Sequence, residues 1–208
     1  MFRFYKVPQL VMWGYPSAIW KIKTTQKEIF LTFDDGPTPN STFEILELLD
    51  NYHAKATWFC LGGNLKSHPS IADTIISKGH LLGNHAYYHE SGWKTSTAKY
   101  LANVELCQKE LNRISEKARL FRPPYGEIKY AQLRLLKEYK IYMWSHISWD
   151  FDPNLDIGKS INKMTKAPTG SILLFHDQIK SVNSTKIILE AVLKHFTNQG
   201  YQFKVLPT

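Results

Sequence analysis

The 208-residue chain carries 26 Lys and Arg residues against 18 Asp and Glu residues, a formal net charge of +8, and 43% of its residues are hydrophobic. This length and balance predict one globular domain and exclude a chain that is disordered by composition. The positive charge suits an anionic polymer or surface, although an ordinary lysine-rich protein explains it more simply, and without a nucleic-acid-binding motif we expect no nucleic acid partner.

The first 27 residues predict an arm that packs on a domain formed by residues 28–208. They are rich in Phe, Tyr and Trp and are broken by Pro8 and Pro16, so we expect a strand or packing arm, with membrane contact as a lesser alternative. They lack an apolar core followed by a small-residue cleavage site, which argues against a secretory signal. With no run of about 18 apolar residues, no membrane-spanning helix is expected. The predicted location is cytoplasmic, or exported by a route that the sequence does not reveal.

From residue 28 onward, strand-like apolar runs alternate with helical patterns. Strands are expected at residues 28–33, 55–61, 80–85, 118–122, 141–147, 171–176 and 201–206. Helices are expected at residues 41–52, 69–79, 97–117, 130–139 and 184–200, with a less regular pattern at 156–168. Seven strands joined by crossovers of this length predict a parallel sheet. The pattern alone leaves open whether this sheet is doubly wound or closed like a barrel.

Unusual polar residues fall at the carboxyl ends of five of these strands. They are Asp34 and Asp35 after the first strand, His85 and His89 after the third, Arg122 to Gly126 after the fourth, Asp150 after the fifth, and His176 with Asp177 after the sixth. Sites of parallel α/β proteins are built at that edge of the sheet, whereas the opposite edge mainly serves stability. The placement therefore predicts one shared site.

The pair Asp34–Asp35 needs a neutralising partner, because adjacent carboxylates repel each other. Each cluster alone has an ordinary explanation, such as a turn, exposed loop histidines, a bracing arginine or a core histidine. Together, His85 and His89 at a spacing of four and one carboxylate make an N2O ligand set that leaves coordination positions open on a divalent metal. The sequence therefore predicts that one aspartate binds a metal ion while the other moves a proton.

The motifs in chain order are "TFDDGP", "GNHAYYH", "RPPYG", "SWDF" and "LLFHD". With these motifs the chain resembles the polysaccharide deacetylases of carbohydrate esterase family 4, from about residue 28 to the C-terminus. That family includes chitin-oligosaccharide and peptidoglycan N-acetylglucosamine deacetylases. The resemblance implies that residues 28–208 form a single catalytic domain, an α/β fold with a distorted (β/α) barrel of about seven parallel strands.

The resemblance also implies the reacting groups. Asp34 would be the catalytic base, and Arg122 would orient it and keep it ionised. Asp35, His85 and His89 would hold a divalent metal, with Zn²⁺ favoured over Co²⁺ or Ni²⁺. Metal-bound water would then attack the acetyl carbonyl of an N-acetylated oligo- or polysaccharide.

Further residues would complete the reaction. His176 would be the general acid, with Asp150 raising its pKa. Four residues are expected at the substrate or its oxyanion: Tyr125, Pro124, Leu174 and Phe151. The backbone N–H of Tyr125 would stabilise the oxyanion, and Leu174 would line the pocket for the acetyl methyl group.

Three departures from the family pattern qualify this hypothesis, one of which is that Ser145 and Ile147 stand where many relatives have Asp. Ala86 stands where relatives usually carry Ser or Thr, so a hydroxyl that steadies the histidine loop is missing, with a cost to metal affinity of up to about 10–100-fold. Phe151 replaces the usual Trp, which keeps an apolar wall but loses a donor. An O-acetyl esterase and a catalytically silent carbohydrate-binding relative are the alternatives to N-deacetylation, and the sequence does not indicate an oligomeric state.

Overall fold

The computed structural model describes residues 4–114 and 119–208 of the chain. Within these residues there are eight strands, eight α-helices and one 3-10 turn. In chain order they are α1 (Gln9–Gly14), β1 (Glu28–Asp35), α2 (Ser41–Asn51), β2 (Ala56–Cys60), α3 (Gly62–Ser67), α4 (Pro69–Ser77), β3 (Leu81–Asn84), α5 (Thr97–Ile114), β4 (Leu120–Phe121), η1 (Pro124–Gly126), α6 (Tyr130–Leu135), β5 (Lys140–Ile141), β6 (His146–Ile147), α7 (Ile157–Met164), β7 (Ile172–His176), α8 (Val182–Asn198) and β8 (Gln202–Phe203).

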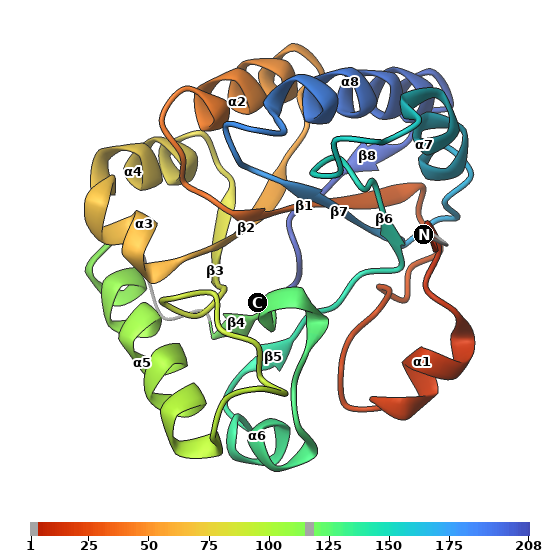
Figure 1. The fold of residues 1–208 in the computed structure, drawn as a ribbon. Helices are drawn as coiled ribbons and strands as arrows, with labels where there is room; N and C mark the ends of the chain where they lie inside the picture. The colour runs from red at the N-terminus through yellow and green to blue at the C-terminus, as the bar shows by residue number, and fades with distance from the viewer. Residues whose placement is uncertain (1–3, 115–118) are drawn as a thin grey trace.

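β1 lies in the middle of a sheet with the order β5-β4-β3-β2-β1-β7-β6, and its strand pairs are parallel. β8 pairs with the first two residues of β1, Glu28 and Ile29. The sheet curls, and helices lie around its outer side (Figure 1). The predicted distorted (β/α) barrel with about seven parallel strands is therefore confirmed.

The central strands are covered on both faces, which explains their continuous apolar runs. Every residue of β2 and all but the first of β1 are buried. Phe33 of β1 stacks on Trp58 with ring centroids 4.7 Å apart, and its centroid lies 5.7 Å from that of Phe175. Helices α2 and α8 cover this core with side chains such as Leu49 and Leu193. Packing across β2, β1 and β7 thus fixes the strand ends that carry the polar residues.

The strand expected at 141–147 is divided in two, and this part of the prediction is wrong. Residues 140–141 form β5 and pair with β4, whereas residues 146–147 form β6 and pair with β7 at the other edge of the sheet. The buried Arg122 guanidinium donates hydrogen bonds to backbone carbonyls between these two strands. Its Nε donates to the Tyr142 carbonyl at 3.2 Å, and its Nη2 donates to the Met143 carbonyl at 2.9 Å. The segment therefore crosses from one sheet edge to the other instead of continuing as a strand.

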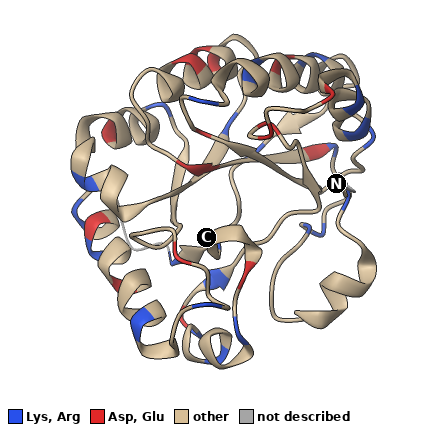
Figure 2. Ribbon diagram, in the orientation of Figure 1, with Lys and Arg blue, Asp and Glu red and all other residues tan. Residues whose placement is uncertain are grey.

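The N-terminal residues lie along the segment that connects β5 to β6. Ile19 exchanges backbone hydrogen bonds with Ile141 and Met143, and Val7 donates to the Ser145 carbonyl at 3.0 Å. Part of this arm is helix α1, where a strand or packing arm was expected. Charged residues lie mainly on the outer helices and loops, and α1 itself carries none (Figure 2). The division of the chain at residues 27 and 28 stays a prediction.

Other differences are small. Helix α3 was not expected, α6 ends at Leu135 rather than at residue 139, and β8 covers only residues 202–203 of the expected strand 201–206. The expected helix end at 115–117 and strand start at 118 lie outside the described residues. None of the helices in the described part of the chain is both long enough and apolar enough to cross a bilayer.

Candidate metal and catalytic site

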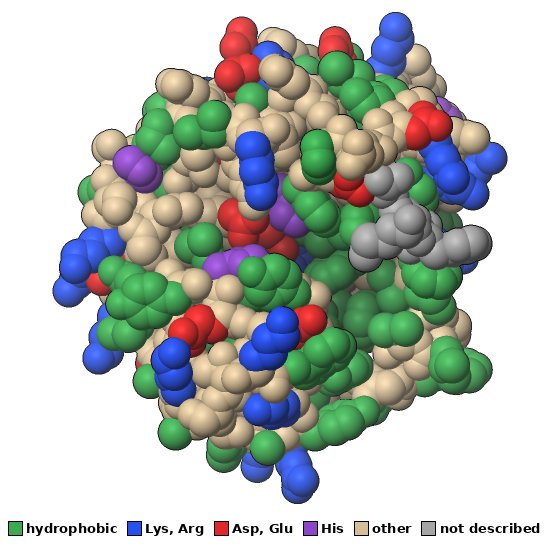
Figure 3. Space-filling view, in the orientation of Figure 1, with side chains coloured by type: hydrophobic (Ala, Val, Ile, Leu, Met, Phe, Trp, Pro, Cys, Tyr) green, Lys and Arg blue, Asp and Glu red, His purple; other side chains and the backbone are tan. Residues whose placement is uncertain are grey.

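The predicted site residues converge at the carboxyl edge of the sheet. Asp34 and Asp35 end β1, and the Cα atoms of Asp34 and His176 are register partners on β1 and β7. One cleft with a volume of about 1030 Å³ is lined by eight of the predicted residues: Asp34, Asp35, His85, His89, Tyr125, Phe151, Leu174 and His176. Figure 3 shows the acidic and histidine side chains side by side at this hollow. The other three, Arg122, Pro124 and Asp150, are buried.

Three side chains form a cluster with the geometry of a metal site. Single ligand atoms of Asp35, His85 and His89 all lie within 4.8 Å of one another. Asp35 Oδ1 is 3.2 Å from His89 Nε2 and 3.7 Å from His85 Nε2. A tetrahedral ion with bonds of about 2.0–2.2 Å separates its ligands by about 3.4 Å, so these spacings fit. Asp35 Oδ1 is also buried without a hydrogen-bond partner within residues 4–114 and 119–208, as expected for an oxygen that faces a cation.

The protonation state of His85 suits a metal ligand. Its Nδ1–H donates to the Arg122 backbone carbonyl at 2.8 Å, which leaves the lone pair on Nε2 pointing at the cluster. Burial lowers the pKa of His85 to about 3, so the ring stays neutral at physiological pH. A metal ligand must be neutral imidazole, and this environment supplies it.

The loop that carries His85 and His89 is held by two asparagines that were not predicted from the sequence. Asn84 Oδ1 accepts the Ala86 N–H at 2.8 Å, and Asn103 Oδ1 accepts the N–H groups of Tyr87 and Tyr88 at 2.9 and 3.0 Å. The side chain of Asn84 in turn donates to a carbonyl of α5 at 2.9 Å. These amides supply contacts to the loop although Ala86 has no hydroxyl.

Asp34 lies beside the cluster and is paired with Arg122. Asp34 Oδ1 accepts from Arg122 Nη1 at 2.8 Å, and the same nitrogen donates to Thr32 Oγ1 at 2.8 Å. The second oxygen, Oδ2, is 3.7 Å from His85 Nε2. Burial raises the pKa of Asp34 above its ordinary value, and the Arg122 charge opposes that rise without cancelling it. Arg122 thus acts on Asp34 in the expected direction, and a raised pKa is the direction that suits a general base.

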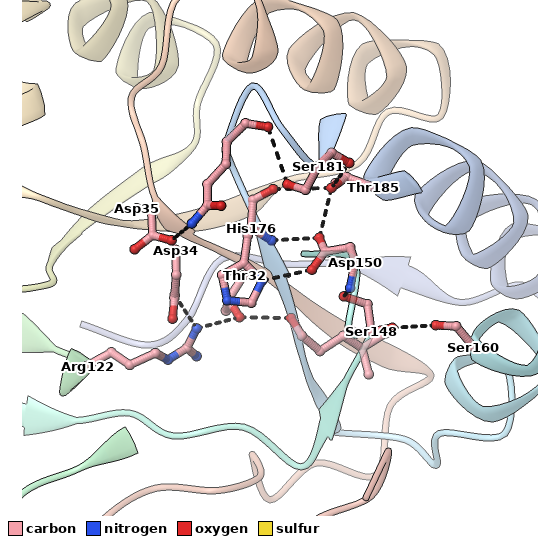
Figure 4. Close-up of polar contacts among 12 residues, drawn as sticks. Thr32, Asp34, Asp35, Arg122, Ser148, Asp150, Ser160, His176, Ser181 and Thr185 are labelled. Atoms are coloured by element: carbon pink, nitrogen blue, oxygen red, sulfur yellow. Dashed lines mark hydrogen bonds and ion pairs between the residues drawn. The ribbon is translucent and has the colours of Figure 1, made fainter. Parts of the chain in front are cut away.

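His176 is paired with Asp150 (Figure 4). Asp150 Oδ1 accepts from His176 Nδ1 at 2.8 Å, and Oδ2 accepts both the His176 backbone N–H and the Thr185 hydroxyl at 2.8 Å. Burial alone would lower the pKa of His176, but the Asp150 charge and hydrogen bond outweigh it and raise the pKa to about 9. The ring is therefore protonated at neutral pH, with Nε2–H as its remaining donor.

The residues expected at the substrate side border the cleft. Tyr125 is exposed, with its ring 4.4 Å from that of His89 between centroids, and Phe151 lies edge-on to His176 at 4.6 Å. Pro124 and the residue before it have no N–H, so the amide of Tyr125 is the first donor of this turn. Leu174 also lines the cleft.

Left-handed backbone conformations gather at this edge of the sheet. Among the non-glycine residues of the described part, Asp35, Ala86, His89 and Tyr125 have φ angles of 76°, 63°, 54° and 60°. Such conformations are unfavourable for L-residues and persist where the surrounding contacts enforce them, often at functional sites. The fold therefore holds two ligand residues in conformations that an unconstrained loop would avoid.

Asp177 braces the turn that carries both aspartates. Its N–H donates to the Asp34 carbonyl at 2.8 Å, and its carboxylate accepts from Thr42 Oγ1 at 2.6 Å and Trp58 Nε1 at 3.1 Å. A Cβ atom at Gly36 would lie only 2.4 Å from Asp177 Oδ2. Glycine at position 36 therefore allows the β7 loop to close over the end of β1.

Gln178 is a further contact that the sequence analysis missed. Its Nε2 donates to Asp35 Oδ2, the carboxylate oxygen that does not face the histidines. One oxygen of Asp35 is thereby engaged while Oδ1 is left for the cluster. The position of Gln178 directly after the "LLFHD" motif could have indicated this contact, but an uncharged residue there does not suggest a role at a metal site.

Comparison with known proteins decides the family. A family model described as polysaccharide deacetylase matches residues 21–144. The chain belongs to the polysaccharide deacetylase family. A peptidoglycan-N-acetylglucosamine deacetylase of Bacillus cereus is 32% identical over 197 residues, which cover 91% of this chain and 90% of the relative. The peptidoglycan-N-acetylmuramic acid deacetylase PdaC of Bacillus subtilis is also 32% identical, over 87% of this chain but only 38% of its own length.

The structural comparison agrees with the family. The crystal structure of the Bc1960 peptidoglycan N-acetylglucosamine deacetylase, in complex with 4-naphthalen-1-yl-N-oxidanyl-benzamide, superposes with a TM-score of 0.87 at 28% identity, covering 94% of each chain. The predicted family, fold and enzyme class, a hydrolase of the polysaccharide deacetylase type, are therefore confirmed. The role of each site residue stays a prediction.

Proposed function

We propose that this polysaccharide deacetylase removes acetyl groups from N-acetylated sugars with the help of one divalent metal ion. The observation that carries the proposal is the cluster of Asp35 Oδ1 with the Nε2 atoms of His85 and His89, at spacings of 3.2 and 3.7 Å around a buried oxygen without a partner in the described residues. Two imidazoles and one carboxylate leave positions open for water and substrate, and this donor set fits Zn²⁺, with Co²⁺ or Ni²⁺ as alternatives.

The chain's own groups divide the proton transfers. When bound, the metal ion would polarise the amide carbonyl and lower the pKa of a water towards ~7. Asp34, held by Arg122 through the 2.8 Å ion pair, accepts the proton of the attacking water. The backbone N–H of Tyr125 stabilises the oxyanion that develops on the carbonyl oxygen, a contribution typically worth a few kcal/mol.

His176 completes the cleavage. An amine is a poor leaving group, so the C–N bond breaks only as the nitrogen takes up a proton. The pKa of about 9 keeps His176 protonated at neutral pH, and because Asp150 holds Nδ1–H, the donor to the nitrogen is Nε2–H. The products are acetate and a free amino sugar. Leu174 and Phe151 border the space for the acetyl methyl group.

The family and the size of the cleft support a substrate class. Two relatives carry the names peptidoglycan-N-acetylglucosamine deacetylase and peptidoglycan-N-acetylmuramic acid deacetylase, and the cleft of about 1030 Å³ is large enough for more than one sugar ring. We therefore infer an N-acetylated oligo- or polysaccharide substrate.

The proposal is tested by measuring the acetate and free amine that the protein releases from chitin oligomers, peptidoglycan and O-acetylated xylan. With one equivalent of Zn²⁺, Co²⁺ or Ni²⁺, we expect equal amounts of acetate and amine from an N-acetylated substrate. The release should stop with a chelator and with Asp34→Asn, whereas Asp73→Asn, an exposed control on α4, should retain activity. Acetate from xylan alone would indicate an O-acetyl esterase, and metal-loaded protein that releases no acetate would indicate a catalytically silent relative.

A further inference from the structure

We propose that the N-terminal arm docks this protein on an anionic lipid surface, with the apolar side chains of α1 inserted at the interface. The proposal is independent of the catalytic function, because it rests on residues other than Asp35, His85 and His89. Three observations carry it: the exposure of α1, its rigid attachment, and the charge of the arm around it.

Helix α1 turns its apolar residues to the outside. Its sequence is QLVMWG, and none of these six described residues is buried. Leu10 is 76% exposed, Trp13 69% and Val11 46%. A surface helix of a globular protein normally directs its apolar stripe to the core. Adjacent exposed apolar side chains on a protein surface instead mark an interaction site.

The helix is nevertheless held firmly. Tyr130 donates its hydroxyl to the Gly14 carbonyl at 2.5 Å, and its ring stacks on Tyr15 with centroids 5.2 Å apart. Tyr15 donates its own hydroxyl to the Ile128 carbonyl at 3.1 Å. The C-terminal end of α1 is thus attached to the α6 region while the side chains of residues 10 and 13 remain exposed. The apolar side chains are presented in a fixed position.

The arm carries basic residues on both sides of α1. Residues 1–27 contain five basic residues, Arg3, Lys6, Lys21, Lys23 and Lys27, and no Asp or Glu. Lys21 and Lys23 are exposed and border the same surface groove as Trp13. Exposed apolar side chains flanked by lysines are the pattern of segments that lie in the interface of anionic membranes. A second copy of the chain fits this surface less well, because a symmetric contact would bring the lysines of both arms together.

The position of α1 connects this surface to the cleft. Six residues of the arm line the same cleft as Asp35, His85 and His89: Phe4, Val7, Pro8, Val11, Tyr15 and Trp20. In Figure 3, hydrophobic side chains run from the hollow at the acidic and histidine residues into this region. Docking through α1 therefore places the cleft mouth near the lipid surface, where a sugar carried on a lipid could reach it.

Co-sedimentation of the full chain with vesicles tests the proposal without any catalytic readout. Vesicles of phosphatidylcholine alone are compared with vesicles that contain about 30% phosphatidylglycerol, at low and high salt. We expect binding to the anionic vesicles that weakens with salt, since each Lys near such a surface is worth about a fivefold change in affinity. Lys21→Gln/Lys23→Gln should therefore bind about 30-fold more weakly, and Leu10→Ser/Trp13→Ser should lose at least about tenfold.

Matched controls separate insertion from general effects. Leu135→Ser/Ile187→Ser removes two apolar side chains that are 63% and 51% exposed elsewhere, and Lys159→Gln/Lys163→Gln removes the same charge from α7. Both controls should bind as the wild type does, and circular dichroism checks that each variant folds. Absence of binding to anionic vesicles, or equal losses in the controls, would overturn the proposal. Dimers in sedimentation velocity that Leu10→Ser/Trp13→Ser abolishes, without vesicle binding, would assign the surface to a second copy.

Discussion

Replacing Asp150 by Asn is expected to slow deacetylation strongly at alkaline pH and little at acidic pH. In the wild type, Asp150 Oδ2 accepts two hydrogen bonds, from the His176 backbone N–H and the Thr185 hydroxyl, while Oδ1 accepts from His176 Nδ1. The amide that replaces the carboxylate can keep the first two donors by turning its oxygen to them, which turns its NH₂ group to the ring nitrogen. A ring that must accept at Nδ1 cannot carry a proton there, so the neutral form of His176 is favoured.

The magnitude follows from the pKa of His176. That pKa is about 9 in the wild type, and without the Asp150 charge it should fall to about the 6.5 of a free imidazole. At pH 8 about nine tenths of the wild-type rings are protonated, against about 3% of the rings in the variant. The value of kcat/KM for an N-acetylated substrate should therefore fall about 30-fold at pH 8 and less than about twofold at pH 5.5.

Two assays test this prediction. The pH profile of kcat/KM should show an alkaline limb that moves to lower pH in Asp150→Asn and an acidic limb that stays nearly in place. An NMR titration of the His176 ring in metal-free protein should show the same fall in pKa, and Asp73→Asn should change neither. A loss of activity that is equal at every pH would refute the reasoning, because it would mean that Asp150 only stabilises the loop.

Four further predictions concern single side chains. Asp35→Ala and His89→Ala should each lose the bound metal ion, measured by elemental analysis after dialysis, and a fully occupied site in both would contradict the assignment. His176→Ala should slow amide cleavage by about 10²–10⁴-fold but cleavage of aryl acetates far less, because their leaving groups need no proton; equal losses would make His176 a structural residue. Gln178→Leu should weaken metal binding about 10–100-fold in competition with a chromogenic chelator, and unchanged affinity would leave Gln178 without a role at Asp35. Burial lowers the pKa of His80 to about 4, below the ~6.5 of a histidine in the unfolded chain. The stability that comes from keeping this ring neutral is therefore present above about pH 6.5 and is lost as the pH falls towards about 4. In denaturant titrations over this range, the free energy of unfolding of His80→Gln should fall less steeply with decreasing pH than that of the wild type.

The sequence predicts the site better than it predicts the connections between strands. Polar residues interrupt the apolar runs at strand ends, so Asp34, His85 and His176 could be placed at one edge from the pattern alone. The division of 141–147 could not be predicted in this way. It depends on Arg122, which lies about 20 residues earlier in the chain and donates to the carbonyl oxygens of two residues inside that segment.

The contacts that support the site also could not be predicted from the sequence pattern. Asn103 and Thr185 lie within helices α5 and α8, where a polar residue ordinarily faces solvent, and only the packing of those helices turns them to the loops they hold. The raised pKa of Asp34 depends on burial, which a motif does not report. Residue type and spacing thus identify the reacting groups, whereas tertiary packing decides their protonation.

Anomalous scattering from a crystal grown with Zn²⁺ is the most direct test of the metal centre. We expect one strong peak per chain, about 2.0–2.2 Å from Asp35 Oδ1 and from the Nε2 atoms of His85 and His89, with Asp34 not bound to the ion. A peak held by Asp34 instead of Asp35, or an empty cluster at saturating Zn²⁺, would contradict this expectation.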